Sequence, residues 1–121
     1  MYPPVFVLAS ASSTVKSLIG SNPVRLWPFG GAGNTPTKPY AVWQVVYGSP
    51  ENYLAGLPDV DGYGVQIDCY GTTATSARNV AAALRDAFEP AAYVTSYNGE
   101  TVDEPTGLAR VSFTVEFLTP R

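Results

Sequence analysis

Residues 109–117, ARVSFTVEF, alternate strictly between apolar and polar side chains. Successive side chains of a β-strand point to opposite faces of its sheet, so this pattern predicts a strand with one buried face. A sheet with one apolar face needs a second layer to cover that face. The strongest pattern in the chain therefore predicts a sheet covered on one side. The predicted inward residues are Ala109, Val111, Phe113, Val115 and Phe117, and the predicted outward residues are Arg110, Ser112, Thr114 and Glu116.

Three earlier segments also have the composition of strands. Residues 63–70, YGVQIDCY, alternate in the same way, and VRLWPF at 24–29 is a short apolar run. Residues 40–48, YAVWQVVYG, are apolar on both faces. Such a strand usually lies centrally in its sheet, or has one face against another subunit.

Residues 91–118 contain two strands and the turn between them. Glu104–Gly107 is the predicted turn because it combines proline and glycine. Asn98-Gly99 is also a strong hairpin signal, but the return strand it would start is too short. We therefore predict a kink or bulge at Asn98-Gly99.

Two segments predict helices. Residues 4–19 and 72–90 both carry apolar side chains at spacings of three and four. Thr73 or Thr75 is expected to cap the second helix. The order of elements is helix, short strand, two strands, helix, two strands. It predicts one α+β domain over residues 1–121, a two-layer sandwich whose mostly antiparallel sheet of four to five strands carries two helices on one face.

Composition narrows the classes of function. The net charge is −3 and the seven Lys and Arg residues are scattered, which argues against a protein that wraps duplex DNA. The single cysteine excludes an internal disulfide. No apolar stretch approaches the ~20 residues that span a bilayer. The start of the sequence lacks the positive charge that is typical of a signal peptide. We expect a soluble protein made in a reducing cytoplasm, without a membrane partner. Only 14% of residues are charged, so burial against a partner costs little desolvation and oligomerisation is expected.

The chain contains no histidine, which excludes the ordinary Ser-His-Asp and Cys-His nucleophile systems and most zinc sites. Cys69 lies on the predicted inward face beside Val65 and Ile67, so we expect a buried structural thiol. The glycines of GGAGN at 30–34 do not match a phosphate loop, which needs GxxxxGK[ST] before a helix. We therefore expect no catalytic residue, no metal and no cofactor.

Acidic residues between the second and third predicted strands raise the alternative of a metal or acid–base site. Glu51, Asp59 and Asp61 do not follow the order of an EF-hand loop, and we interpret them as turn and surface residues. Asp68 is predicted to be a solvated or paired outward residue. Aromatic residues could stack on bases, but no basic groove accompanies them, so core and interface roles are expected. These residues are Trp27, Tyr40, Trp43, Tyr47 and Tyr53.

Residues 49–62 are predicted to form a long loop, whereas most hairpin loops have about two to five residues. Tyr53 and Leu54 lie in it between Pro50 and Pro58, which stiffen their supports. Apolar residues presented in this way are typical of interface anchors. The candidate contacts to another subunit or a partner protein are Glu51, Asn52, Tyr53, Leu54, Trp43 and Tyr47.

The chain resembles the small tail-completion proteins of tailed bacteriophages, which belong with the tail terminators of long-tailed phages. The resemblance runs from PPVF at the start to FLTPR at the end. Its most distinctive part is SPENYL followed by GLPDVD and VQIDCY. The helix TSARNVAAALRDAFEP and the segment YVTSYNGETVDEPTGLARVSFTVEF also match, although an Ala-rich helix is a weaker signal.

The resemblance implies a structural virion protein without enzymatic activity. It implies a ring, commonly a hexamer, that caps the head-proximal end of the tail tube, ends tube polymerisation and offers the docking surface for the head connector or neck protein. The implied partners are other copies of the chain, the tail tube protein and the connector. DNA would pass through the ring without sequence-specific binding. The implied location is the phage tail, after assembly in the host cytoplasm, and no single residue receives a role from the resemblance.

Three other interpretations stay open from the sequence. One is a different head–tail connector or neck adaptor of a phage. Another is a small non-catalytic ligand-binding α+β module, and the third is a hydrolase that uses the acidic loop. The mass in solution separates a ring from a monomeric module, and a dependence of thermal stability on metal or substrate would favour the enzyme.

Overall fold

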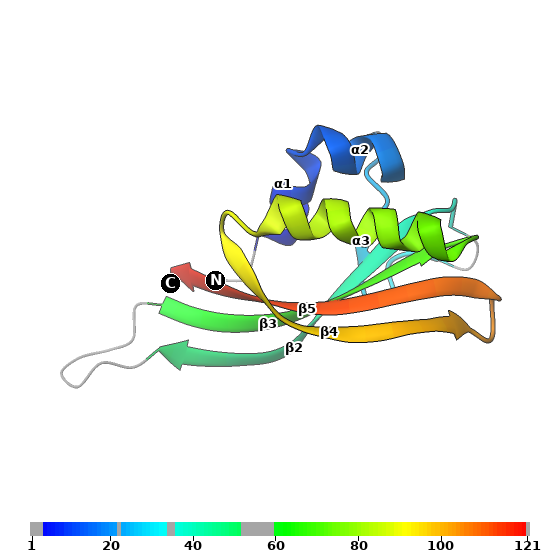
Figure 1. The fold of residues 1–121 in the computed structure, drawn as a ribbon. Coiled ribbons are helices and arrows are strands. Elements are labelled where there is room, and N and C mark those ends of the chain that lie inside the picture. Colours follow the sequence, from blue (N-terminus) through cyan, green and yellow to red (C-terminus); the bar gives the residue numbers. More distant parts are fainter. Residues whose placement is uncertain (1–3, 22, 34–35, 52–59, 121) are drawn as a thin grey trace.

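A computed structural model describes residues 4–21, 23–33, 36–51 and 60–120 of the chain. Within them, three helices lie on one face of a five-stranded sheet (Figure 1), which confirms the predicted α+β sandwich. The helices are α1 (Val5–Ser10), α2 (Ser13–Ile19) and α3 (Ala74–Phe88). The strands are β1 (Leu26–Pro28), β2 (Tyr40–Glu51), β3 (Val60–Gly71), β4 (Ala92–Asp103) and β5 (Leu108–Pro120).

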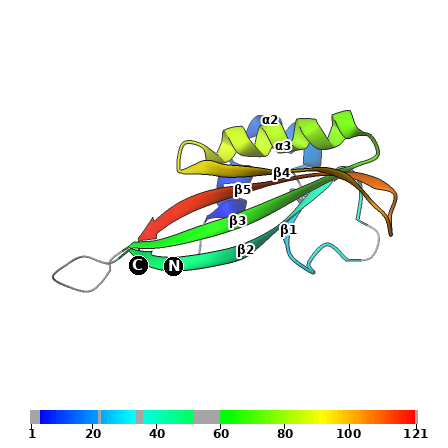
Figure 2. The same cartoon turned by 60° about the horizontal axis from the view of Figure 1, so that its bottom comes forward.

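The strands lie in the order β1-β2-β3-β5-β4 (Figure 2). The β1–β2 pair is parallel, and the other three pairs are antiparallel. β2 and β3 form one pair of long strands, β5 and β4 form a second, and α3 connects β3 to β4. In the described part of the chain, β1 pairs with Ala41–Trp43 of β2 and with no other segment. The sheet therefore ends in a very short strand on one side and in β4 on the other.

The core lies between the helices and the inward side chains of β3 and β5. α3 buries Val80, Leu84 and Phe88, and the ring of Phe88 meets that of Phe117 edge to face with centroids 5.8 Å apart. Burying a side chain of this size contributes about 1.5–3 kcal/mol. The residues that the alternation places inward and that are fully buried are Val65, Ile67, Cys69, Phe113, Val115 and Phe117.

The predicted helix over residues 4–19 is wrong, because two shorter helices replace it (Figure 1). α1 ends at Ser10 and α2 begins at Ser13. Ser12 between them is extended, and its Oγ accepts a hydrogen bond from the backbone N–H of Val15 at 3.2 Å. A serine that caps a new helix competes with continuation of the preceding one. The described chain therefore carries three helices rather than two.

The predicted cap and turn of the second half are confirmed. Thr73 caps α3 by accepting a hydrogen bond from the backbone N–H of Ser76, and residues 104–107 form the turn between β4 and β5. The register between β4 and β5 shifts between Tyr97 and Gly99, which is the predicted bulge. Gly99 has φ +109°, a conformation that glycine adopts without strain.

The predicted loop over residues 49–62 is too long. β2 continues to Glu51 and β3 begins at Val60, with Ser49 paired to Gly62 in the ladder. The start of β3 also pairs with the end of β5, where Val60 lies opposite Pro120. A third strand thus supports the β2–β3 hairpin where the local sequence is rich in glycine and proline.

Candidate assembly surfaces

Three of the six predicted contact residues, Trp43, Tyr47 and Glu51, lie on β2. Glu51 is the last residue of β2, and Tyr47 lies opposite Gly64 in the β2–β3 ladder. Trp43 is half-buried and packs against the core. These placements leave the roles of all six residues as contacts a prediction. Asn52, Tyr53, Leu54 and also Asp59 lie outside the described residues.

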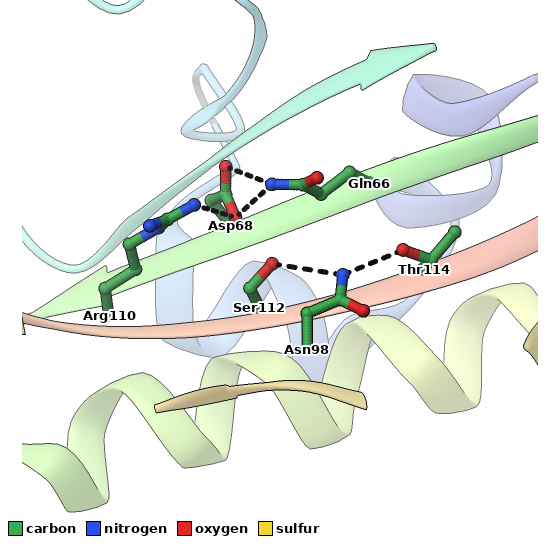
Figure 3. Close-up of polar contacts among 6 residues, drawn as sticks. All are labelled: Gln66, Asp68, Asn98, Arg110, Ser112 and Thr114. Atoms are coloured by element: carbon green, nitrogen blue, oxygen red, sulfur yellow. Dashed lines mark hydrogen bonds and ion pairs between the residues drawn. The ribbon is translucent and has the colours of Figure 1, made fainter. Parts of the chain in front are cut away.

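The sheet face opposite the helices, which we call the helix-free face, carries a cluster of polar side chains (Figure 3). The register brings its side chains into rows across the strands, with Asp68 opposite Ser112 and Gln66 opposite Thr114. Asp68, Ser112 and Thr114 are buried although no helix of the described chain covers them. The polar side chains of the helix-free face are Gln44, Gln66, Asp68, Asn98, Arg110, Ser112 and Thr114.

Asp68 is held on this face by two neighbouring side chains. Arg110 Nη2 donates to Asp68 Oδ1 at 3.1 Å, and Gln66 Nε2 donates to Oδ1 at 3.1 Å and to Oδ2 at 3.3 Å (Figure 3). Partial burial is the largest single influence and lowers the pKa of Arg110, but Asp68, Tyr70 and Asp103 together raise it by more, so the pKa ends above its ordinary value. Asp68 was predicted to be either solvated or paired, and the structure shows the paired alternative.

The Asn98 bulge links β4 to the same surface. Asn98 Nδ2 donates to Thr114 Oγ1 at 2.8 Å and to Ser112 Oγ at 3.4 Å (Figure 3). Ser96 Oγ donates to Asn98 Oδ1 at 2.8 Å. A bulge changes the direction of one side chain relative to the regular strand, and here it points an amide across β5. The network consists of hydrogen-bond donors and acceptors with one neutralised ion pair, so it is suited to polar contact rather than to proton transfer.

A row of aromatic rings lies at one end of the helix-free face. Tyr40 stacks on Tyr70 with ring centroids 5.0 Å apart, and Trp27 meets Tyr40 at 6.1 Å. Burial, with the nearby carboxylate of Asp103, raises the pKa of Tyr40. Tyr40 is itself buried, in agreement with the expectation of a packing role.

The family model described as "Tail completion protein gp17" matches residues 3–120 of the chain. The chain belongs to this family. It is thus a structural protein of the bacteriophage tail, and the resemblance noted in the sequence is confirmed. No curated protein matches the chain.

One solved structure with a similar chain is titled "Virion of native gene transfer agent (GTA) particle". The match covers 97% of this chain and 92% of that chain, with a TM-score of 0.75 and 12% sequence identity. At this identity the likeness shows a shared fold. A structural protein of a virion assembles with other proteins, and exposed apolar side chains are typical of the surfaces that make such contacts.

Among the described side chains of this tail-completion fold, large apolar ones are exposed at four places. One is α1, where Val7 is 67% exposed, and another is β4, where Tyr97 and Val102 are 68% and 65% exposed. The sequence analysis did not predict an exposed apolar surface on β4. The available signal is that Tyr97 and Val102 are the large apolar residues in the otherwise polar stretch 95–103. The remaining two are single residues, Phe29 and Val46.

Chemistry-bearing groups are sparse in the described residues. They contain no group of three or more His, Cys, Asp or Glu side chains placed to hold a metal ion. Cys69 is fully buried, and burial, followed by the nearby Asp68 carboxylate, raises the pKa of its thiol. Among the described helices, none has the length and apolar content needed to cross a membrane.

Proposed function

We propose that this tail-completion protein forms a ring, hexameric as in the proteins it resembles, at the head-proximal end of the tail tube. The ring ends tube polymerisation and provides the surface on which the head connector docks. The family match over residues 3–120 is the observation that carries this proposal. The partners are other copies of the chain, the tail tube protein and the connector.

The low fraction of charged residues in the chain supports extensive contact with other proteins. With 14% charged residues, much of its surface can leave water without desolvating full charges. A closed ring also needs two different patches on each subunit. Candidates for one patch, or for the contact with a tail protein, are Trp43, Tyr47, Glu51, Asn52, Tyr53 and Leu54.

The pairing of the arginines supports free passage of DNA. Arg78 Nε lies 2.5 Å from Glu100, and Arg85 lies 3.1 Å from Asp86. Arg110 is paired with Asp68 on the helix-free face. Arginines that already hold carboxylates add little to phosphate binding, and the net charge of −3 opposes it further. DNA therefore slides through the ring without being held.

We assign the protein no catalytic activity. The absence of histidine from the chain supports this, as does the ion pair that holds Asp68. Two further acids are likewise paired with arginines, Asp86 of α3 with Arg85 and Glu100 of β4 with Arg78.

The test uses phage particles made without this protein. We expect tail tubes of uneven and excessive length that do not join heads, and we expect purified protein added during tube growth to restore a narrow length distribution. Electron micrographs give both lengths and joined particles. Tubes of normal length that fail only to join heads would support the neck-adaptor alternative instead. Normal tails already joined to heads would overturn the proposal.

A further inference from the structure

Most of β2 has an open edge. β1 covers Ala41–Trp43, so that from Gln44 to Glu51 the strand pairs with β3 on one side and with no described segment on the other (Figure 2). The backbone N–H and C=O groups on the outer side of such an edge are available to another strand.

This edge lacks the charges by which proteins usually protect an open strand. Residues 44–49, QVVYGS, contain no charged side chain, and Val46 is 45% exposed. Natural edges commonly carry lysine or another charge that prevents pairing with a second chain. The register shift between Val45 and Tyr47 and the proline at position 50 limit the available edge to a short segment. An uncharged edge of this kind is typical of a site where a partner strand adds.

The opposite edge of the sheet is β4. Beyond the Asn98 bulge, Gly99–Asp103 runs in regular register beside Leu108–Ser112 of β5. β4 has no strand on its other side in the described chain, and Val102 on it is 65% exposed. Each subunit thus presents two short open edges on opposite sides of the sheet, one on β2 with a register shift at Val46 and a regular one on β4.

The strand directions make the two edges compatible. Three antiparallel steps separate β2 from β4, through β3 and β5, so β2 and β4 run in opposite directions. When a second copy is placed beside the first by rotation about a ring axis, its β4 lies antiparallel to β2 of the first. The added pair then continues the antiparallel order of the sheet.

Charge favours this pairing over a symmetrical one. A β4–β4 contact would bring Glu100 and Asp103 of two copies onto one short stretch, where like charges oppose pairing. A β2–β2 contact would close a dimer and leave β4 open. Residues 44–49 of the β2 edge, by contrast, carry no charge to repel the acids of β4.

We infer that residues 44–49 of β2 in one copy pair antiparallel with Gly99–Asp103 of β4 in the next copy. This inference rests on the proposed ring. It identifies the contact between neighbouring subunits, residues 44–49 against Gly99–Asp103, which we call the joint. The contact is head to tail, as closure into a ring requires, and it converts separate sheets into one sheet that continues around the ring.

Cysteine cross-linking tests the joint. In a Cys69→Ser background, Val46→Cys and Val102→Cys are introduced singly and together, and each protein is treated with a short bis-maleimide, alone and on tail tubes. The doubly substituted protein is expected to give a ladder of covalent oligomers that ends at the ring size, and each single variant only monomers. A dimer from either single variant, or no ladder from the double variant in either condition, would overturn the inference.

Charge substitutions give an independent reading. Val46→Lys and Val102→Lys are each expected to abolish oligomers, while a mixture of the two gives one-to-one dimers joined through the two intact edges. Val46→Thr and Val102→Thr serve as matched controls, and thermal unfolding confirms that every variant is folded. Rings formed by either lysine variant alone would overturn the joint.

The outcome for the joint is separable from that for the proposed function. Unmodified protein that limits tail length while the double cysteine variant gives no ladder overturns the joint alone. A complete ladder with no effect on tail length or head joining overturns the proposed function and keeps the joint.

Discussion

Asp68 and Arg110 form an ion pair across two central strands, with Arg110 Nη2 3.1 Å from Asp68 Oδ1, on the sheet face that no described helix covers. Asp68 is 7% exposed, and Gln66 occupies its second oxygen as well as its first. Arg110 Nε is buried without a hydrogen-bond partner among the described residues. Protein groups therefore hold the Asp68 carboxylate, while the Arg110 side chain stays 33% exposed.

We predict that this pair is energetically coupled. Asp68→Asn is expected to lower the free energy of unfolding by about 1–3 kcal/mol, because it leaves a partly buried guanidinium without its counter-charge. The double variant with Arg110→Gln should lose less than the sum of the two single losses, by about 1 kcal/mol. Urea unfolding of the four proteins measures this. Strict additivity would contradict the coupling.

The exposed pair Arg78–Glu100 provides a comparison. It joins α3 to β4, and both side chains are about half exposed or more. Exposed ion pairs contribute little because solvent screens them. Glu100→Gln should therefore change the unfolding midpoint less than Asp68→Asn does.

A second prediction concerns Gly71, where β3 passes the start of α3. A Cβ at this position would lie 2.8 Å from Ser76 Oγ and 2.9 Å from the backbone nitrogen of Ala77. Gly71→Ala must push the first turn of α3 away from the sheet, and overpacking of this kind costs about 1–3 kcal/mol. Thr72→Ala at the neighbouring exposed position is the control and should be nearly neutral. Equal unfolding midpoints for the two variants would show that the contact yields without cost.

The elements that the sequence predicted are those determined locally. The alternation of β3 and β5, the Thr73 cap and the bulge at Asn98-Gly99 each depend on residues close together in the chain. The break at Ser12 was missed because a cap and a helical spacing compete within the same residues.

Features that depend on distant partners could not be predicted in this way. The length of β3 depends on pairing with the end of β5, and the burial of Asp68 depends on Arg110. The open edges of β2 and β4 follow from the strand order, which the sequence pattern left undetermined. The candidate loop contacts Tyr53 and Leu54, chosen from their apolar character, stay a prediction.

A third prediction concerns the thiol of Cys69. Its full burial and raised pKa predict that maleimide labels it only after unfolding, so the labelling rate should follow the denaturant dependence of unfolding. Labelling of the folded protein at the rate of a free thiol would contradict the burial.

The raised pKa of the Cys69 thiol also predicts that stability depends on pH. Folding raises the pKa of the Cys69 thiol above its ordinary value of 9.0. The contribution of the neutral buried thiol to the free energy of unfolding is therefore fully present below pH 9.0. It is lost as the pH rises above that value, because the thiol of the unfolded chain ionises first. Above that pH, wild type should lose stability relative to Cys69→Ala by about 1.4 kcal/mol per pH unit. Urea unfolding of both proteins between pH 7 and pH 11 measures the difference. A constant difference across this range would be inconsistent with a buried neutral thiol.

The last prediction concerns Tyr53 and Leu54 as anchors between subunits or toward a tail protein. Replacing both by serine removes two large apolar side chains, and the loss of such anchors commonly weakens binding by about 2 kcal/mol or more each. We expect ring formation and tube binding to fall at least tenfold while the thermal midpoint of the monomer stays unchanged. Ala55→Ser changes the same segment without removing a large side chain and should assemble normally. Native mass measurement and co-sedimentation with tail tubes give the two readings. If both are unaltered, Tyr53 and Leu54 are not anchors, and assembly depends on surfaces such as the open edges of β2 and β4.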